Sequence, residues 1–412
     1  MTYQKTLDWI HSHKANGRRP NLSRMEHLLN QLGNPQHQFP AVHIVGTNGK
    51  GSTTSYLQHI FTASGYKIGT FTSPYITRFN ERIAIDNHPI PDEDLIDVVN
   101  QVQPHLAQLP QELGQITEFE LVTVLMFVYF ASQNVDIAFI EAGIGGLYDA
   151  TNVFTALAVV LTSISPDHQE TLGDSLTRIA QHKLGVLEED VTLIFGKMTN
   201  NVRQTCYNEA YNYECPTYEL GQDFTILDNG GAFDFTFHEF QLKDIHLKML
   251  GKHQKANAAL AIMTSLVLCP QFPQISIPSI TAGLEETSWP GRCELIKPNI
   301  LLDGAHNPDS IAKLIDLLKE EFRHRPIKIL FAGLKRKPLA EMLHQLSDFD
   351  VAVTAFNFYD AMPLADYPSD YARVTNYADW LAQAEQDVET LYVVTGSLYF
   401  ISEVRQHILS KS

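Results

Sequence analysis

The stretch AVHIVGTNGKGS, residues 41–52, decides the fold of this chain. Residues 41–45 form a nearly continuous apolar run, which is typical of a strand buried on both faces of a parallel sheet. Gly46 ends this predicted strand, and a helix is predicted for residues 53–64. A glycine-rich turn between a strand and a helix directs backbone N–H groups at an anion, at the positive end of the helix dipole. The stretch therefore predicts a phosphate-binding loop in an α/β fold.

The residue types in this loop suit ATP. Lys50 supplies a mobile positive charge for the β- and γ-phosphates, and Ser52 offers a hydroxyl to Mg²⁺. The spacing departs from the general Gly-x4-Gly-Lys-Ser/Thr pattern, because Ile44 replaces its first glycine and Gly51 follows the lysine. A glycine turn without function is the alternative, and the strand–helix setting favours a nucleotide site. The predicted ATP-binding residues of the loop are Thr47, Asn48, Gly49, Lys50, Gly51, Ser52 and Thr53.

Composition narrows the partners and the compartment. The 412 residues carry a net charge of −17, and such an acidic surface repels nucleic acid and anionic membranes. The most apolar stretch, residues 121–130, is too short to span a bilayer and is predicted to be a buried helix. No apolar signal segment opens the sequence, and its four cysteines lack metal-ligand spacing. We therefore expect a cytoplasmic globular protein that binds neither nucleic acid nor membranes.

Two series of buried strands alternate with helical patterns, which predicts two α/β domains. A segment of alternating residues at 217–250 indicates an antiparallel hairpin region, followed by a helix at 253–268. We take residues 287–291 as the linker. The predicted domains are 1–289, a large P-loop-type parallel-sheet domain, and 290–412, a smaller Rossmann-like α/β domain. The predicted strands are 41–45, 67–71, 135–140 and 158–164 in the first and 300–302, 328–331, 351–355 and 391–394 in the second, which also has a helix at 310–322.

Three residues that follow predicted strands are metal-ligand candidates. Ser73, Glu141 and His168 bring a hydroxyl, a carboxylate and an imidazole to strand ends, where ligands of parallel sheets bind. Lys183 belongs to a predicted helix after His168. From the residues alone, a helical lysine is expected on a solvated face.

These segments together resemble the folylpolyglutamate synthase/dihydrofolate synthase family, a branch of the Mur ligases. The resemblance covers nearly the whole chain, and the order and spacing of the motifs carry it. They are Arg24-Met25, Gly33-Asn34-Pro35, the loop 46–52, Thr72-Ser73-Pro74, Asn80-Glu81-Arg82-Ile83, residues 141–146 and 149–153, Gly251-Lys252-His253-Gln254, Asn257-Ala258, residues 303–308 and 396–399.

The resemblance implies an ATP-dependent ligase that joins L-glutamate to a folate carboxylate through an acyl phosphate. It implies ATP and Mg²⁺ as cofactors, with a second Mg²⁺ and a monovalent cation as further options, and a monomeric protein. Lys50, Lys183 and His306 are then the catalytic candidates, with Lys183 open to carbamylation. Matching positions give further candidates: Asn257, Arg292 and Asp303 for the nucleotide, Ser73, Glu141 and His168 for the metal, and Thr117, Phe119 and Asp149 for folate. Arg292 follows the linker, so domain closure would bring it to the phosphates.

Departures from the family pattern leave the exact activity open. Leu147-Tyr148, Lys335-Arg336-Lys337-Pro338 and Asp360-Ala361 replace segments that differ in many members. The last two put glutamate affinity or acceptor preference in doubt. Extension of the glutamate tail of tetrahydrofolate is favoured, with glutamate addition to dihydropteroate as an additional activity. The alternatives are a Mur ligase acting on UDP-muramoyl peptides and a paralogue that binds folate or nucleotide without turnover.

Overall fold

The computed structural model describes residues 1–13 and 21–410, which divide into two compact units. The first unit contains Met1–Tyr75, Phe79–His246 and Lys255–Thr287, without the undescribed positions. The second contains Ile76–Arg78, Leu247–Gln254 and the described chain from Ser288 onward. Each unit has its own sheet and its own buried core, as the α/β prediction requires.

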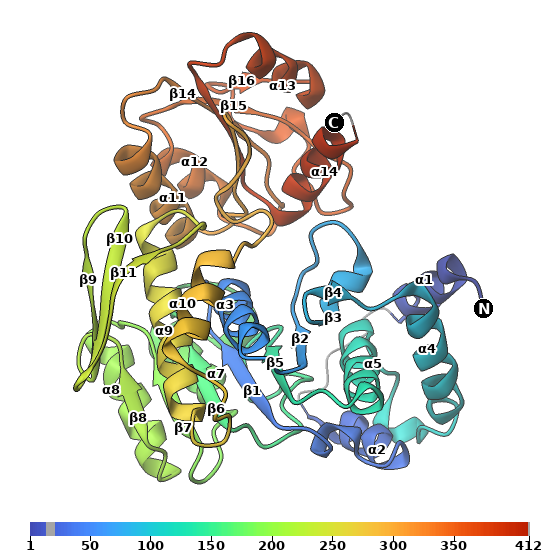
Figure 1. Cartoon of the computed structure of the whole chain (residues 1–412). Helices are drawn as coiled ribbons and strands as arrows, with labels where there is room; N and C mark the ends of the chain where they lie inside the picture. The colour runs from blue at the N-terminus through green and yellow to red at the C-terminus, as the bar shows by residue number, and fades with distance from the viewer. Residues whose placement is uncertain (14–20, 411–412) are drawn as a thin grey trace. The chain divides into compact units, whose positions relative to one another are not determined.

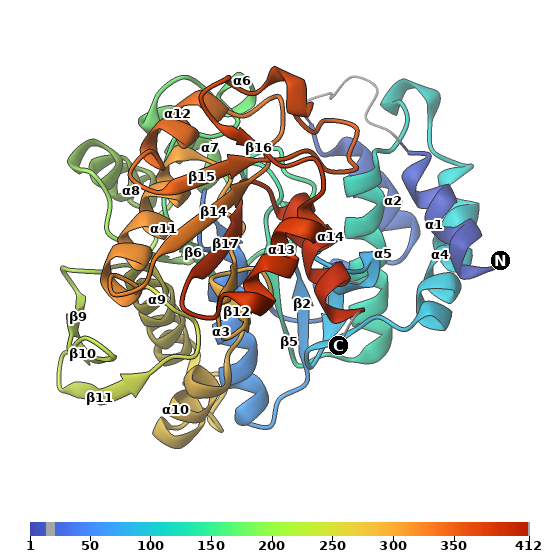
Figure 2. The same cartoon turned by 90° about the horizontal axis from the view of Figure 1, so that it is seen from above.

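A largely parallel sheet forms the centre of the first unit (Figures 1 and 2), in the order β4-β3-β2-β5-β1-β6-β7-β8. The pairs from β2 to β8 are all parallel, while β3 and β4 extend the sheet antiparallel beyond β2. The four strands predicted here are confirmed with small changes at their ends. The strands are β1 (Ala41–Val45), β2 (Ile68–Phe71), β3 (Ile83–Ile85), β4 (His88–Pro89), β5 (Ile137–Glu141), β6 (Ala158–Leu161), β7 (Thr192–Phe195) and β8 (Thr217–Glu219).

Helices pack on this sheet, and several begin at capping side chains. The Thr117 hydroxyl accepts from Glu120 N while Glu120 accepts from Thr117 N, which fixes the start of α5. The predicted buried helix at 121–130 is confirmed within α5. The helices are α1 (Tyr3–His11), α2 (Ser23–Gln31), α3 (Lys50–Ala63), α4 (Asp92–Leu106), α5 (Glu118–Gln133), α6 (Gln169–Leu172), α7 (Leu176–Leu184), α8 (Asn200–Asn212), α9 (Lys252–Leu268) and α10 (Ile277–Glu286).

The segment 217–250 was predicted as one antiparallel region, and this is wrong for its first strand. β8 pairs parallel with β7 at the edge of the large sheet. The rest forms a separate antiparallel sheet of β9 (Phe224–Asp228), β10 (Ala232–Phe237) and β11 (Phe240–His246). The ammonium of Lys255 on α9 holds the β9–β10 turn, because it pairs with Asp228 and donates to Ala232 O at 3.0 Å.

The second unit is a six-stranded sheet with helices on both faces. Its order is β12-β13-β17-β14-β15-β16, parallel except for β12. Buried residues of α11 and α12 pack on one face, and those of α13 and α14 pack on the other. The elements are β12 (Glu294–Lys297), β13 (Ile300–Leu302), α11 (Pro308–Glu321), β14 (Ile327–Phe331), α12 (Leu339–Gln345), β15 (Asp350–Val353), β16 (Ala372–Arg373), α13 (Tyr377–Gln386), β17 (Leu391–Thr395) and α14 (Leu398–Leu409).

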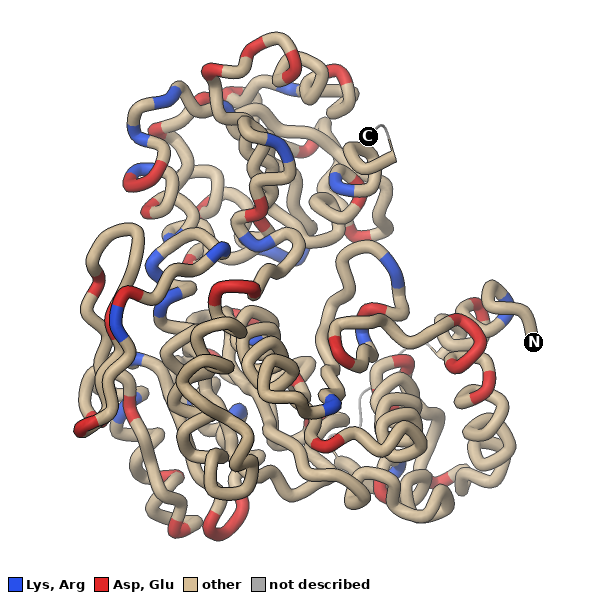
Figure 3. Tube along the Cα trace, viewed as in Figure 1, with Lys and Arg blue, Asp and Glu red and all other residues tan. Residues whose placement is uncertain are grey.

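Charged residues of both signs are interspersed along the trace (Figure 3). Across the described residues, no helix combines the length and the apolar character that a membrane crossing demands. All four cysteines are free, so no disulfide constrains the described chain.

Candidate active site

The loop between β1 and α3 is tied to the segment that follows β6. Thr47 N donates to Ser163 O at 2.8 Å, and Asn48 N donates to Ser163 Oγ at 3.0 Å. In return, the hydroxyls of Thr162 and Ser163 donate to Asn48 O at 2.7 and 2.9 Å. These bonds hold the loop rigidly across the carboxyl ends of two adjacent parallel strands.

The backbone N–H groups at the start of α3 are the donors best placed for an anion. The helix begins at Lys50, earlier than predicted, and its first intrahelical bond runs from Thr53 N to Gly49 O. The N–H groups of residues 50–52 therefore have no partner within the helix. Because the N–H groups of Thr47 and Asn48 are already committed to Ser163, residues 50–52 present the anion-binding end of the loop.

Gly49 needs to be glycine for two separate reasons. Its φ of 92° lies in the left-handed region, which other residues rarely adopt. A Cβ at this position would also lie 2.5 Å from Asn257 Oδ1. Asn257, on α9, is buried, and this contact places it directly against the predicted phosphate loop.

Lys50 is the first residue of α3, where the loop ends, and it lies close to a predicted metal ligand. Its Nζ donates to Gly46 O at 3.2 Å and lies 3.6 Å from Glu141 Oε1. The other oxygen of Glu141 accepts from Ser73 N at 3.4 Å. The structure therefore brings Lys50, Glu141 and the backbone of Ser73 together at the ends of β1, β5 and β2.

His168 is placed less directly at this site. It follows β6 by seven positions, in a left-handed conformation just before α6, with an exposed ring. Its Nε2 lies 3.8 Å from Asp167 Oδ1. Among the described residues, no three side chains of His, Cys, Asp and Glu gather as a metal site. A metal here would need hydroxyl, water or phosphate oxygens besides Glu141, which is how Mg²⁺ is commonly held.

Lys183 is buried, so the expected solvated face is wrong. It is 5% exposed, and its Nζ donates to Gly46 O at 2.8 Å, beneath the phosphate loop. Burial lowers its pKa to about 7, and the positive charge of Lys50 acts in the same direction. The negative charges of Asp167, Asp149 and Glu141 oppose this shift. At neutral pH a substantial fraction of Lys183 is therefore the nucleophilic neutral amine.

The folate candidates converge on Gly143 in the β5–β6 connection. A Cβ at Gly143 would lie 2.5 Å from Phe119 Cζ and 3.2 Å from Asp149 Oδ2. Phe119 belongs to the first turn of α5, which Thr117 caps. The structure thus places an aromatic ring and a buried carboxylate on the same glycine, with Thr117 two residues from the ring.

In the second unit, Arg292, Asp303 and His306 lie around Gly304. A Cβ at Gly304 would lie 3.1 Å from the Arg292 guanidinium. Asp303 accepts from Cys293 N at 3.0 Å, from the Cys293 thiol at 3.2 Å and from Ala305 N at 2.9 Å. The His306 Nδ1 donates to Gly304 O at 2.8 Å, so a neutral His306 carries its lone pair on Nε2.

Sequence reasoning missed several polar residues that support these candidates. His253 is neutral, because burial lowers its pKa to about 4 despite the opposing charge of Asp303. Its motif was recognised without a role for this residue. Thr151 likewise lies in a recognised motif, residues 149–153, without an assigned role. His43 and Ser163 were missed. The one available signal was a histidine within the otherwise apolar run of β1.

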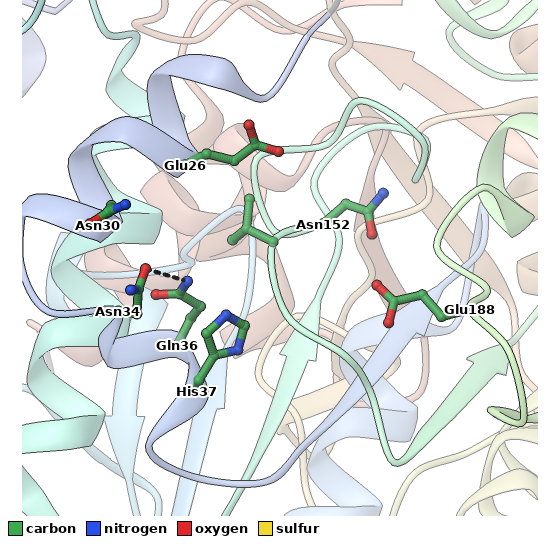
Figure 4. Close-up of a pocket in the computed structure, with 8 residues that line it drawn as sticks. Glu26, Asn30, Asn34, Gln36, His37, Asn152 and Glu188 are labelled. Carbon is green, nitrogen blue, oxygen red and sulfur yellow. Dashed lines mark hydrogen bonds between the residues drawn. The ribbon is translucent and has the colours of Figure 1, made fainter.

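A separate polar cavity of about 370 Å³ lies in the first unit (Figure 4). None of the predicted site residues lines it. One lining residue, Asn152, contacts a predicted site residue, because its backbone N–H donates to Asp149 O at 2.9 Å. The lining residues are Glu26, Asn30, Asn34, Gln36, His37, Asn152, Val153 and Glu188.

Two family descriptions match the chain. The Mur ligase middle domain matches residues 44–265, and the Mur ligase glutamate ligase domain matches residues 291–398. The first match begins inside β1 and so includes the predicted phosphate loop, residues 46–52.

Relatives match over essentially the full length. The chain is 36% identical to a dihydrofolate synthase/folylpolyglutamate synthase of Bacillus subtilis, covering 98% of this chain and 99% of the relative. It matches the apo form of the Lactobacillus casei enzyme FPGS with a TM-score of 0.88, at 35% identity over 99% of this chain and 100% of that one. An FPGS complex with AMPPCP and folate matches with the same score, identity and coverage.

Proposed function

Because the chain belongs to the folylpolyglutamate synthase/dihydrofolate synthase family of Mur ligases, we propose that Lys50 and the start of α3 hold ATP while its γ-phosphate passes to a folate carboxylate. The chain is an ATP-dependent ligase that extends folates, in agreement with its full-length relatives, which are named dihydrofolate synthase/folylpolyglutamate synthase and folylpolyglutamate synthase. The observation that carries the proposed site is the convergence of Lys50, Glu141 and Lys183 on one phosphate-type loop.

The proposed reaction has two steps. A folate carboxylate oxygen attacks the γ-phosphorus, the bond to the β-phosphate oxygen breaks, and ADP and an acyl phosphate form. The amine of L-glutamate then attacks the acyl carbon, loses a proton, and expels inorganic phosphate to leave the amide. The first step needs mainly positioning and neutralisation of charge. Lys50 and the N–H groups of residues 50–52 supply positive potential in a chain whose net charge is −17.

The residues present fit a magnesium ion that substrate phosphates help to hold. Glu141 is buried at the end of β5 and offers a carboxylate beside Lys50 and Ser73. We propose that Ser73, Glu141 and His168 hold Mg²⁺, with Ser52 as a hydroxyl contact. When bound, the metal would neutralise charge on the transferred phosphoryl group. A second Mg²⁺ and a monovalent cation bound at this site are part of the same proposal.

We propose that Lys183 is carbamylated in the active protein. Its neutral amine would add to CO₂ and release a proton, which converts a cation beneath the loop into an anion. The buried position and the pKa of about 7 support this reaction, because only the neutral amine is nucleophilic. Intact-mass measurement in bicarbonate should show the added mass of one CO₂, and Lys183→Ala should lose activity that short carboxylic acids restore.

The remaining assignments involve the second unit and the acceptor pocket. We propose that Asn257, Arg292 and Asp303 contact the nucleotide, that His306 assists phosphoryl transfer, and that L-glutamate binds in the second unit. Thr117, Phe119 and Asp149 would hold the folate ring system, with the Phe119 ring stacked on it. A carboxylate beside an aromatic ring suits a heterocycle that carries N–H donors.

Addition of the first glutamate to dihydropteroate is a second candidate activity. The Bacillus subtilis relative carries both names over its full length, which favours a shared active site for both acceptors. We further propose a monomer that works in the cytoplasm, where four free thiols would stay reduced.

Phosphate release tests the function. The purified chain with ATP, Mg²⁺ and L-glutamate would receive tetrahydrofolate, dihydropteroate or a UDP-muramoyl peptide in turn. Glutamate-dependent release is expected with tetrahydrofolate, and release with dihydropteroate would establish the second activity. Lys50→Met should lower kcat by about 100- to 1000-fold. Lys243→Met, at an exposed position of β11, should leave kcat unchanged. Binding of ATP without release in any mixture would contradict the proposal.

A further inference from the structure

The carboxylate of Asp149 is held by three donors from its own loop. Ile144 N donates to Oδ2 at 2.8 Å, while Thr151 N and Thr151 Oγ1 donate to Oδ1 at 3.1 and 2.6 Å. Asp149 is only 1% exposed, so its orientation depends on these bonds rather than on solvent. Two donors saturate the lone pairs of Oδ1. The oxygen with acceptor capacity left is Oδ2, which faces Phe119 across Gly143.

The hydroxyl proton of Thr151 fixes the direction of a longer chain of hydrogen bonds. His43 Nε2 lies 2.8 Å from Thr151 Oγ1. A carboxylate only accepts hydrogen bonds, so the single hydroxyl proton of Thr151 goes to Asp149. The imidazole must therefore donate through an Nε2–H. The hydrogen bonds therefore run from His43 to Thr151 and then to Asp149.

His43 is the rigid end of this chain. It lies in the middle of β1, between Ile140 of β5 and Val159 of β6 in the sheet register. The residue is 1% exposed, and the ring of Phe154 packs 5.1 Å from its ring centroid. Burial lowers the pKa of His43 to about 4, so the ring is neutral at physiological pH. A central strand next to the phosphate loop thus anchors the Asp149 loop.

We propose that His43 is a positioning residue that, through Thr151, presents Asp149 Oδ2 to the folate ring system. The proposal rests on the proposed function, because it assigns Asp149 to the folate pocket. His43 touches neither substrate in this account. Its removal leaves Thr151 free to turn and lets the carboxylate rotate, so the offered oxygen loses its fixed direction towards the Phe119 side.

Paired substitutions test this role through binding rather than through stability alone. His43→Leu and Thr151→Val remove the donors, whereas His43→Gln and Thr151→Ser retain an N–H and a hydroxyl at the same reach. We expect the first two to raise the KM for folate about 10-fold, with the KM for ATP within about twofold of wild type. The conservative pair should recover most of the affinity. The double variant should raise the KM for folate no more than either single variant does, because both substitutions break the same series of hydrogen bonds.

A buried threonine elsewhere serves as the matched control. Thr205 on α8 is also buried, and its hydroxyl donates at 2.9 Å to Asn201 O of the same helix, which contains no candidate site residue. Thr205→Val should lower stability without changing the KM for folate. Equal increases in the KM values for folate and ATP, or additive effects of His43→Leu and Thr151→Val, would overturn the proposal.

Histidine NMR separates this proposal from the proposed function. In ¹⁵N-histidine-labelled protein, His43 should be the neutral Nε2–H tautomer, and Thr151→Val should shift its Nε2 resonance. An Nδ1–H tautomer would overturn the proposal whatever the enzyme does. Wild-type protein that shows the expected tautomer but releases no phosphate with any folate would instead contradict the proposed function.

Discussion

Lys183 is the residue whose environment differs most from the expectation for a helical lysine. Its hydrogen bond to Gly46 O makes it part of the predicted phosphate loop's support. A signal for its burial was present in the sequence, because Ile179, Ala180, Lys183 and Leu184 form one face of α7 and all four are buried. Burying a lysine on an apolar helix face costs stability, so its presence there supports its assignment as a catalytic residue.

Lys183 predicts a specific dependence of stability on pH. Folding lowers its pKa from 10.5 to about 7, so between these values the unfolded chain binds more protons than the folded one. The resulting penalty is fully present below pH 7 and is relieved as the pH rises towards 10.5. In bicarbonate-free buffer, Lys183→Met should therefore gain up to about 4 kcal/mol relative to wild type at pH 6 and less at pH 9. Urea unfolding at both pH values measures this, and curves that stay parallel would refute the assignment.

A substitution at Gly143 tests the folate candidates. The Cβ of Gly143→Ala would collide with Phe119 Cζ and approach Asp149 Oδ2. We expect the KM for folate to rise about 10- to 100-fold through displacement of the ring, with little change in the KM for ATP. Gly231→Ala in the β9–β10 turn is the matched control, since its Cβ would meet no atom within 4 Å. An unchanged KM for folate in Gly143→Ala would remove Phe119 and Asp149 from the pocket.

At the scale of elements, a buried ion pair holds the start of α5, where the folate candidates Thr117 and Phe119 lie. Arg24 on α2 lies 2.8 Å from Glu120 Oε1, and it also donates to Leu113 O at 3.0 Å. Glu120 in turn accepts from Thr117 N at the helix start. Because both charged side chains are buried, each depends on the other for compensation. The pair therefore fixes where α5 begins and where Thr117 and Phe119 lie.

Breaking the Arg24–Glu120 pair should lower the free energy of unfolding. Arg24→Met would leave Glu120 as an uncompensated buried charge, and we expect a loss of about 3–5 kcal/mol in the free energy of unfolding. Arg24→Met with Glu120→Leu should recover much of that loss. The exposed pair Arg178–Asp174 is the control, where Arg178→Met should cost about 1 kcal/mol or less. Equal losses at both pairs in urea titrations would contradict the account of α5.

The sequence predicted most central strands because residues buried on both faces leave an uninterrupted apolar run. β1 and β13 have the predicted ends, and β2, β14 and β17 differ by one residue at one end. β5, β6 and β15 differ by two or three residues at one end. The outer strands of both sheets were missed, and so was β7, which lies inside the large sheet. β3, β4, β12 and β16 are short and partly exposed, so their sequences lack such a run. β8 was assigned to the hairpins because residues 217–250 share one alternating pattern. Side-chain networks such as His43–Thr151–Asp149 join residues far apart in the chain and could not be predicted from local pattern.

At the scale of the whole molecule, the candidate residues are divided between two units. Lys50, Glu141 and Lys183 belong to the first, whereas Arg292, Asp303 and His306 belong to the second. The proposed reaction therefore requires both units, since neither contains the full set. The sequence predicts domains of 1–289 and 290–412, and this boundary stays a prediction. A relative that matches with both AMPPCP and folate bound shows that an enzyme of this fold holds the two ligands together.

The most direct test of the central claim is the transfer of oxygen from folate to phosphate. Tetrahydrofolate monoglutamate labelled with ¹⁸O in its γ-carboxylate would be incubated with the chain, ATP, Mg²⁺ and unlabelled L-glutamate. If ATP activates the carboxylate as an acyl phosphate, each inorganic phosphate released should carry one ¹⁸O from the folate. Glutamate-dependent release of phosphate that contains no ¹⁸O would contradict the account.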